Sequence, residues 1–313
     1  MHLVTGGAGF IGSHLVKGLN KRGVSDILVV DDLTNGGKFK NLSDCQVADY
    51  MDKEEMRVAI MDGSFSLEPE VIFHQGACTD TMERDGRYMM ENNFTFSKLL
   101  LEYALSHRIP FIYASSAAIY GLNRSSEPLP KNERPLNVYG YSKLAFDQYL
   151  RRRLDDSAAT VAGLRYFNVY GPRETEKGKM ASMVYQLYRQ IRDTGEARLF
   201  EGTDGFANGQ QRRDFIYVED LVRINLFFAS KSGFRGIVNV GTGESRSFND
   251  VANALVTLLK KGAVKYIPFD RELEGKYQSF TEADLTALRK AGYGEPFTPL
   301  EEGIAQSVEW WGR

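Results

Sequence analysis

Several kinds of residue and segment are scarce in this chain of 313 residues. It has two cysteines, Cys45 and Cys78, which are too few for a disulfide framework or a thiolate metal site. The 4 histidines show no paired ligand spacing, so we expect no metal. No apolar run approaches the roughly 18 residues of a membrane span. These absences exclude disulfide-rich, zinc-binding and membrane-spanning classes as interpretations of the sequence.

The chain also lacks a charge excess of either sign. Lysine and arginine total 39 and aspartate and glutamate 41, giving a net charge of −2. Such a balance offers no general attraction to nucleic acid or to an anionic membrane, so we expect a small-molecule partner. Residues 1–6 already have the pattern of a strand that runs into a turn. We therefore expect no signal peptide and a cytoplasmic location.

Strand-like and helix-like segments alternate through the first half, and 42% of the residues are hydrophobic. This alternation predicts an α/β fold with a parallel sheet covered by helices on both faces. The expected strands begin at residue 3 and lie at 27–30, 71–73, 110–114 and 161–167. The expected helices are 11–20, 92–105 and 139–154. Later segments include helices at 184–191, 221–228, 248–259 and 300–311, strands at 214–218 and 236–240, and an exposed loop at 201–211.

A glycine motif joins the first expected strand to the first expected helix. Gly7, Gly9 and Gly12 have the Gly-x-Gly-x-x-Gly spacing, and Gly6 adds a three-residue repeat. Glycine permits a tight turn, a close approach of the backbone to a pyrophosphate, and close packing of helix on strand. The pyrophosphate then lies at the positive end of the helix. Together with Asp31 about 20 residues downstream, the motif predicts a Rossmann dinucleotide site.

Which dinucleotide binds is left open by the charges near Asp31. Its carboxylate suits the ribose 2′-hydroxyl of NAD, and Asp32 adds negative charge. Lys38 and Lys53 are near enough in sequence to neutralise the 2′-phosphate of NADP. The alternative for both lysines is a solvated surface.

After residue 170 the regular alternation of strand-like and helix-like segments ends, which predicts two interleaved domains. We expect residues 1–170 and about 214–242 to form the doubly wound Rossmann domain. Residues 171–213 and about 243–313 are then a smaller, C-terminal substrate-binding domain.

A tyrosine and a lysine at the start of a helix form the candidate catalytic pair. Tyr139 and Lys143 are four residues apart, which places them on one helical face. A neighbouring ammonium, with a positive nicotinamide nearby, favours the phenolate and lowers the pKa of the tyrosine. The preceding strand ends at Ser116, whose hydroxyl suits a hydrogen bond to the substrate oxygen, although a helix cap is the alternative. The pattern predicts hydride chemistry on a hydroxyl-bearing substrate.

In this order, these motifs resemble the extended short-chain dehydrogenase/reductase family, whose members mostly act on nucleotide-linked sugars. Within it, the chain is similar from end to end to the nucleotide-sugar epimerases that act on ADP-heptose. The stretches that carry the resemblance are VTGGAGFIGS, ADYMDKE, FHQGAC, YASSAAIYG, PLNVYGYSK, RYFNVYGPRE, EKGKMAS, RRDFIYVED and EGKYQSFT. The most specific of them is RYFNVYGPRE followed by EKGKMAS.

The resemblance implies inversion at C6 of the heptose in ADP-D-glycero-D-manno-heptose, on the way to the lipopolysaccharide core. Tightly bound NADP would take hydride from C6, leaving a transient ketone, and return it to the opposite face. Lys177 would act with Tyr139 as a second acid/base group. The family implies NADP rather than NAD, and a homo-oligomer, with a pentamer as its usual state.

The resemblance also implies binding residues. Those for the cofactor are Gly6, Gly9, Phe10, Ile11, Gly12, Asp31, Asp32, Lys38, Lys53, Gln75, Gly76, Ala77, Cys78, Thr79, Asn92, Lys143, Val169 and Lys177. Those for the substrate are Ser116, Asn168, Lys179, Gln186, Phe200, Glu201, Gly202, Thr203, Arg213 and Tyr277. Arg213 has its own rationale, because a guanidinium fork suits a diphosphate.

Two features depart from the family pattern. Asp32 stands where a neutral residue meets a 2′-phosphate more comfortably, which weakens the implied preference for NADP. The loop 205–211 is longer than expected, which leaves the alignment of Arg212 against Arg213 open.

The sequence bears on four alternatives to the epimerase. A 4,6-dehydratase needs an acidic pair after the catalytic serine, where this chain has Ala117 and Ala118. A nucleotide-sugar 4-epimerase shares the motifs and remains an alternative. A simple dehydrogenase that releases its cofactor and a non-catalytic dinucleotide-binding regulator are the other two.

Overall fold

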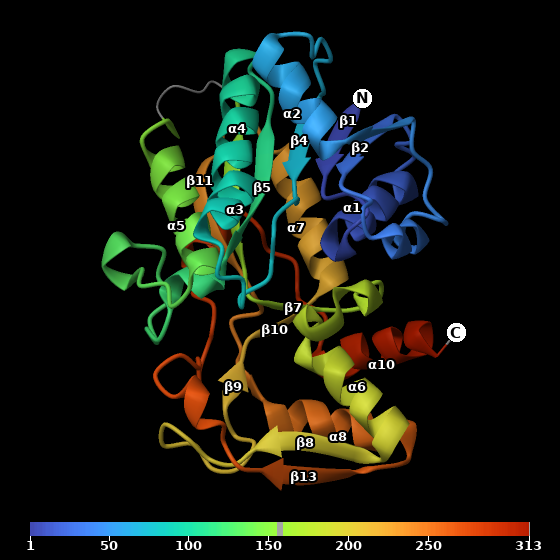
Figure 1. Ribbon diagram of the computed structural model, residues 1–313, viewed down its shortest axis with the longest axis vertical. Helices are drawn as coiled ribbons and strands as arrows, with labels where there is room; N and C mark the ends of the chain where they lie inside the picture. Colours follow the sequence, from blue (N-terminus) through green and yellow to red (C-terminus); the bar gives the residue numbers. More distant parts are fainter. Residues whose placement is uncertain (155–158, 313) are drawn as a thin grey trace.

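The computed structural model describes residues 1–154 and 159–312, and in these ranges seven parallel strands form one sheet. The strand order is β11-β6-β5-β4-β1-β2-β3, and every pairing is parallel. The strands are β1 (His2–Thr5), β2 (Ile27–Asp31), β3 (Asp49–Asp52), β4 (Val71–His74), β5 (Phe111–Ser116), β6 (Val161–Tyr166) and β11 (Arg235–Val240). The predicted α/β fold with a doubly wound parallel sheet is confirmed (Figure 1).

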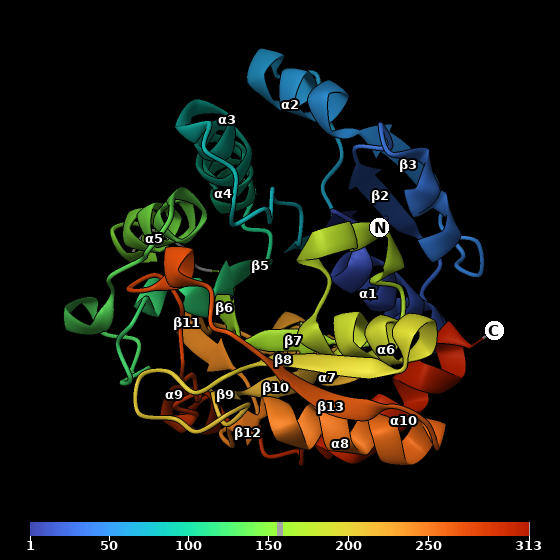
Figure 2. The same ribbon diagram turned by 60° about the horizontal axis from the view of Figure 1, so that its bottom comes forward.

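Helices cover both faces of this sheet because successive strand residues point to opposite sides. Val4 and Val29 belong to a core with residues of α1 (Phe10–Lys21) and α7 (Val218–Ser230). Leu3 and Leu28 belong to the core on the other face. That face carries α2 (Lys53–Asp62), α4 (Phe96–Ser106) and α5 (Val138–Arg151). Figure 2 shows the two layers on either side of the strands.

The strand order reverses between β1 and β4, and the two backbones diverge there. Gly6, which follows β1, has φ 65° and lies so close to Gly76 that a Cβ on it would stand 2.6 Å from the Gly76 Cα. A Cβ on Gly12 would stand 2.0 Å from the Gly6 carbonyl oxygen. Since ligands of such sheets bind at the switch point, these glycines mark the expected crevice.

The remaining elements gather beyond the carboxyl ends of the strands (Figure 1). Their shared core contains Val184, Leu199, Val251 and Ile304. The elements are β7 (Asn168–Tyr170), α6 (Met183–Thr194), β8 (Glu196–Phe200), β9 (Arg212–Arg213), β10 (Phe215–Tyr217), β12 (Arg246–Ser247), α8 (Phe248–Leu259), β13 (Ala263–Ile267), α9 (Thr286–Lys290) and α10 (Leu300–Trp311). α9 is an exception, because its Leu288 belongs to the core that α1 and α7 share on the sheet. The division into two interleaved domains stays a prediction.

Some local predictions differ from the structure. The helix expected at 92–105 is interrupted, because α3 (Gly86–Met90) continues through a π-helical turn at Glu91–Thr95 before α4 begins. This turn lets the buried Asn93 bond the Cys78 backbone and Ser142. The loop 201–211 is not exposed throughout, since Gln211 is buried. The sequence did not predict β3, α2, β8 or β13. No helix in the described part of the chain is long and apolar enough to cross a membrane.

A buried ionic network holds α5 against the sheet. The Arg165 guanidinium on β6 donates to Asp147 of α5 at 2.9 Å and to Glu133 at 2.6 Å. Asp147 also accepts hydrogen bonds from Tyr113 at 2.7 Å and Ser115 at 3.0 Å, both on β5. Arg165 and Asp147 are both 0% exposed. The helix that carries Tyr139 and Lys143 is therefore tied to two neighbouring strands.

We expect Arg165→Met to lower the free energy of unfolding by about 3–5 kcal/mol, because Asp147 and Glu133 would remain buried without their cation. Denaturant titration measures this. The control is Arg57→Met, an exposed ion pair with Glu54, which should cost no more than about 1 kcal/mol. A loss for Arg165→Met no larger than the control would contradict the role given to the network.

Candidate active site

A groove of about 330 Å³ lies at the switch point. Gly6, Gly9 and Gly12 line it, together with the first helical residues Phe10 and Ile11. No side chain caps the start of α1, so its first backbone N–H groups are free for a ligand. The cradle has room for a diphosphate only because its glycines lack Cβ atoms. The groove therefore fits the predicted dinucleotide.

The predicted adenosine-side residues also line the groove, but several are already paired within the protein. The Asp31 carboxylate accepts from the Ala8 backbone N–H at 2.8 Å and from the Lys38 ammonium at 3.0 Å. Lys53 donates to Asn92 at 2.9 Å. Bonds from Thr34, helped by Lys38 and Lys53, lower the pKa of Asp32. Two carboxylates and two ammonium groups thus face one another.

The strip that follows β4 forms the next part of the wall. Gln75, Gly76, Ala77, Cys78 and Thr79 all line the groove. Asn93 holds Cys78 at both its backbone N–H, at 2.8 Å, and its carbonyl, at 2.9 Å. This strip therefore has a defined position beside the glycine loop.

A second, larger cavity of about 740 Å³ adjoins the groove and shares Phe10, Gln75 and Lys177 with it. Its wall contains Ser116, Tyr139 and Lys143. The structure therefore brings all four predicted catalytic residues to one cavity. They come from β5, from the first turns of α5, and from the turn Thr175–Met180.

Asn137 begins the catalytic helix, since its side chain accepts from the Gly140 N–H at 2.8 Å. Lys143 is 4% exposed and donates to the Ala114 carbonyl at 2.9 Å. Burial lowers its pKa to about 8, although Asp147 acts to raise it. The ammonium therefore titrates just above neutral pH.

The pKa expected for Tyr139 is a correction to the sequence analysis. In the protein chain itself, burial raises the pKa of Tyr139, and a hydrogen bond with Ser116 only partly offsets this. Lys143 does not lower it as predicted, because the ammonium is directed to the Ala114 carbonyl. Ser116 also accepts from the Ala118 N–H at 3.1 Å, so it caps the following turn as well.

Lys177 reaches the cavity from a different part of the chain. Its ammonium lies 5.6 Å from the centre of the Phe10 ring, at the start of α1. Burial lowers the pKa of Lys177, whereas Glu174 raises it. A lysine with a lowered pKa exchanges protons more readily near neutral pH.

The far end of the large cavity is aromatic and carries one buried cation. The Arg213 guanidinium lies 5.3 Å from the Phe248 ring centre and 4.9 Å from that of Tyr277. Burial lowers its pKa. Phe200 contacts Tyr277 edge-on. Arg213, and not Arg212, lines this cavity, because Arg212 turns to Ser245.

Not every predicted substrate residue is at the wall. The predicted substrate residues Asn168, Gln186, Phe200, Arg213 and Tyr277 line the large cavity. Val169, which was predicted to bind the cofactor, lines the large cavity and not the groove. Lys179, Glu201, Gly202 and Thr203 line neither cavity. The longer loop explains this for Gly202, since its backbone packs against Phe206 and Ala207.

Other lining residues were missed by the sequence analysis. They are Gln190, Arg198, Gln211, Phe248, Lys276 and Gln278 in the large cavity, and Asn41, Arg173 and Glu176 in the groove. Arg173, Glu176, Lys276 and Gln278 lie within stretches that carry the family resemblance, although no role was predicted for them. No spacing or motif in the sequence marks the others, because only the tertiary fold brings their segments here.

Comparison with known proteins agrees with this geometry. The model of the NAD dependent epimerase/dehydratase family matches residues 2–241. A curated ADP-L-glycero-D-manno-heptose-6-epimerase from Alkalilimnicola ehrlichii is 55% identical over 310 residues, covering 99% of this chain and 97% of the relative.

Two solved structures are similar over almost the whole chain. The Helicobacter pylori ADP-L-glycero-D-manno-heptose-6-epimerase has a TM-score of 0.85 at 34% identity, covering 98% of this chain and 95% of its own. The Thermus thermophilus UDP-glucose 4-epimerase in complex with NAD has a TM-score of 0.80 at 29% identity, covering 99% and 98%.

The buried Lys143 predicts a pH-dependent stability. Its pKa falls from 10.5 to about 8 on folding, which costs on the order of 3 kcal/mol below pH 8. The cost is relieved as the pH rises from about 8 toward 10.5, because the unfolded chain then binds more protons than the folded one. Lys143→Met should therefore raise the free energy of unfolding at pH 7, by less at pH 10.

Denaturant titrations of ligand-free protein at several pH values measure this difference. The exposed Lys131→Met is the control and should change little at any pH. A gain for Lys143→Met that stays constant from pH 7 to 10 would show that the lysine is not strained by burial.

Proposed function

The chain belongs to the NAD dependent epimerase/dehydratase family, and from this premise we propose that it is an ADP-L-glycero-D-manno-heptose 6-epimerase. The reaction inverts C6 of the heptose in ADP-D-glycero-D-manno-heptose by transient oxidation to a ketone. Its product would serve lipopolysaccharide core synthesis. The relative that is 55% identical over nearly the whole chain supports this substrate.

The observation that carries the proposal is the composition of one cavity wall. Ser116, Tyr139 and Lys143 line it from the Rossmann sheet and its helix, and Lys177 lines it from the segment after β7. An epimerase needs proton-transfer groups for two presentations of one carbon, and a one-direction dehydrogenase needs only one. Tyr139 and Lys177 supply two such groups from separate elements.

The groove at the switch point is where a nicotinamide dinucleotide fits. The glycine turn, the start of α1 and the strip 75–79 would hold its diphosphate and nicotinamide half, and Lys38, Lys53 and Asn92 its adenosine half. When bound, the dinucleotide accepts hydride from C6 and returns it to the opposite face. Val169 and Lys177 lie where the large cavity begins.

Proton handling falls to the chain's own residues. In one presentation of the sugar, Tyr139 takes the proton of the C6 hydroxyl while Ser116 donates a hydrogen bond to the oxygen. The positive nicotinamide would favour the phenolate of Tyr139, and the Lys143 ammonium would hold the nicotinamide ribose. In the other presentation, Lys177 gives a proton to the same oxygen as the ketone is reduced. Its lowered pKa helps it to act in both directions.

The aromatic end of the large cavity suits the ADP moiety. The buried Arg213 guanidinium provides a fork for a diphosphate. Phe200 and Tyr277 offer faces for the nucleoside, and Asn168 and Gln186 offer polar groups to the sugar. Roles for Glu201, Gly202 and Thr203 would require the loop 204–209 to move, and a role for Lys179 would require the turn Thr175–Met180 to move.

For the cofactor we propose NADP over NAD. Support comes from Lys38 and Lys53 in the groove beside Asp31, whose carboxylate already accepts from Ala8 and Lys38 and is thus less free for a ribose hydroxyl. Asp32 opposes this preference. A cytoplasmic location and a homo-oligomer, as in the family's pentamer, stay predictions.

The wild-type protein should convert ADP-D-glycero-D-manno-heptose, which is followed by NMR of the C6 proton. Tyr139→Phe and Lys177→Met should each lower kcat by about 10²–10⁴-fold, because each removes an acid/base group. Bound dinucleotide and thermal unfolding are the controls and should not change. Normal turnover by Lys177→Met would disprove the second acid/base group, and turnover of UDP-glucose instead would favour a 4-epimerase.

Cofactor preference should respond to charge at the adenosine side. Lys38→Met should reduce the ratio of NADP to NAD affinity by about tenfold, and Asp32→Asn should raise it by a similar factor, since each changes one charge near the 2′ position. Equilibrium binding of both dinucleotides measures the ratio. Lys40→Met is the matched control, because Lys40 is in the same segment but does not line the groove. Equal ratios in all variants would place the 2′ group elsewhere.

A further inference from the structure

The segment that carries Lys177 is a closed loop, defined here as residues 171–182. Its two ends are joined by the buried carboxylate of Glu174, which accepts from the Gly171 N–H at 3.2 Å and from the Ser182 hydroxyl at 2.8 Å. The Ser182 N–H bonds the same carboxylate. Because both ends meet at one buried group, loop 171–182 holds together as a unit.

This loop forms one side of the groove as well as part of the large cavity. Arg173, Glu176 and Lys177 line the groove, and Lys177 also lines the cavity. The Glu176 carboxylate packs so closely on Gly37 that a Cβ there would stand 2.5 Å away from it. Loop 171–182 thus touches the segment that bears Lys38.

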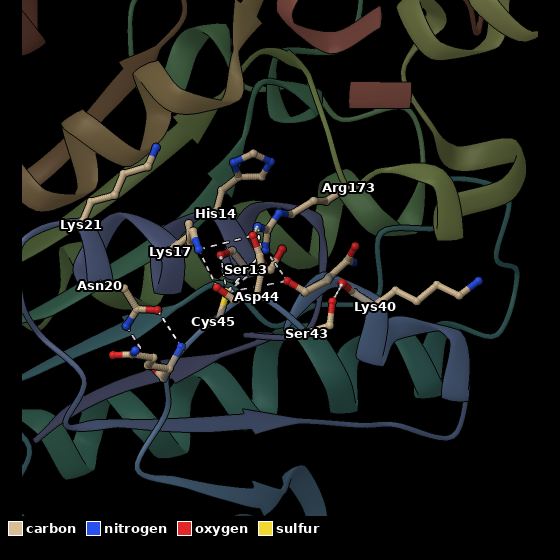
Figure 3. A network of polar contacts seen from close by, with 12 residues as sticks. Ser13, His14, Lys17, Asn20, Lys21, Lys40, Ser43, Asp44, Cys45 and Arg173 are labelled. Carbon is tan, nitrogen blue, oxygen red and sulfur yellow. Dashed lines mark hydrogen bonds and ion pairs between the residues drawn. The ribbon is translucent and has the colours of Figure 1, made fainter. Parts of the chain in front are cut away.

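Arg173 makes the strongest connection between these two sides of the groove. Its guanidinium donates to both carboxylate oxygens of Asp44, at 2.7 and 2.8 Å, and to the Asn41 carbonyl (Figure 3). The Arg173 side chain is 7% exposed, and its backbone φ of 66° is unusual for a residue other than glycine. Such a conformation persists where surrounding contacts determine it.

Two further residues, His14 and Asn41, connect the sides of the groove to the first helix and the glycine turn. The His14 Nε2 on α1 bonds the Pro172 carbonyl at 3.0 Å, and its Nδ1 bonds the Glu219 carboxylate at 3.0 Å. Asn41 donates its side-chain N–H to the Ala8 carbonyl at 3.0 Å. Both sides of the groove are therefore anchored where the diphosphate is expected.

We propose that Arg173 and Asp44 form a latch that keeps the dinucleotide in its groove and positions Lys177 at the cavity. The proposal rests on the proposed function, because a reaction that returns hydride to the same carbon needs the dinucleotide to stay through both half-reactions. One loop forms a side of the groove and carries the proposed second acid/base group. Arg173 and Asp44 are positioning residues in this arrangement.

The test measures release of prebound NADP, chased with excess unlabelled dinucleotide and without any sugar. Arg173→Met and Asp44→Ala should each accelerate release at least tenfold, because each removes the contact between Arg173 Nη2 and the Asp44 carboxylate. At saturating NADP both variants should lower kcat while KM for the sugar stays within about twofold. Arg192→Met is the matched control, an exposed arginine paired with Asp193, and should leave release unchanged.

Comparing the double variant with the single variants distinguishes loss of the latch from general damage to the fold. The double variant Arg173→Met with Asp44→Ala should release NADP no faster than the faster single variant, since one contact is lost in all three. The conservative variant Asp44→Glu, which keeps a carboxylate for Arg173 and for Lys17, should release NADP within about threefold of wild type.

Unchanged release in both single variants, or additive effects in the double variant, would overturn the proposal. If Arg173→Met does not fold, Asp44→Ala and Asp44→Glu still test the proposal, because the Asp44 side chain is exposed. Release is measured without sugar, so a wild-type protein that fails to epimerise ADP-heptose would refute the proposed function without hiding the latch result.

Discussion

The whole site depends on one close approach of two backbones, at the point where β1 and β4 diverge. Gly6 lies against Gly76, and the Gly6 carbonyl lies where any side chain on Gly12 would begin. Only glycine leaves room for this crossing, which opens a groove beside the start of α1. The groove and the adjoining cavity take their positions from it, since Phe10 and Gln75 line both.

Around that crossing, reactive groups are held in two different ways. Tyr139 and Lys143 are on a helix that the buried Arg165, Asp147 and Glu133 tie to the sheet. Burying Lys143 lowers the free energy of unfolding. The same burial lowers the pKa of its ammonium to about 8. Lys177, in contrast, is on a loop that is held by polar contacts to the other side of the groove. The helix that is tied to the sheet and the loop that is held by polar contacts thus meet at one cavity.

The helix with Tyr139 and the loop with Lys177 suit a reaction that must treat both faces of one carbon alike. In the proposed reaction, a base fixed to the sheet would serve one presentation, and a group from the second region would serve the other. The aromatic end with Arg213 lies in the same cavity.

The amino-acid sequence by itself determined the parallel α/β fold, the glycine motif at the crossing and the Tyr139–Lys143 pair. These follow from the hydrophobic periodicity and from residue spacings within short stretches of the sequence. It did not reveal β8 and β13, the π-helical turn before α4, or Arg173 and Phe248 at the cavities. Tertiary structure alone decided the directions in which the pKa values of Tyr139 and Lys143 shift, since desolvation depends on what packs around a group. It also decided which loop residues face the ligand, because those neighbours come from distant parts of the chain.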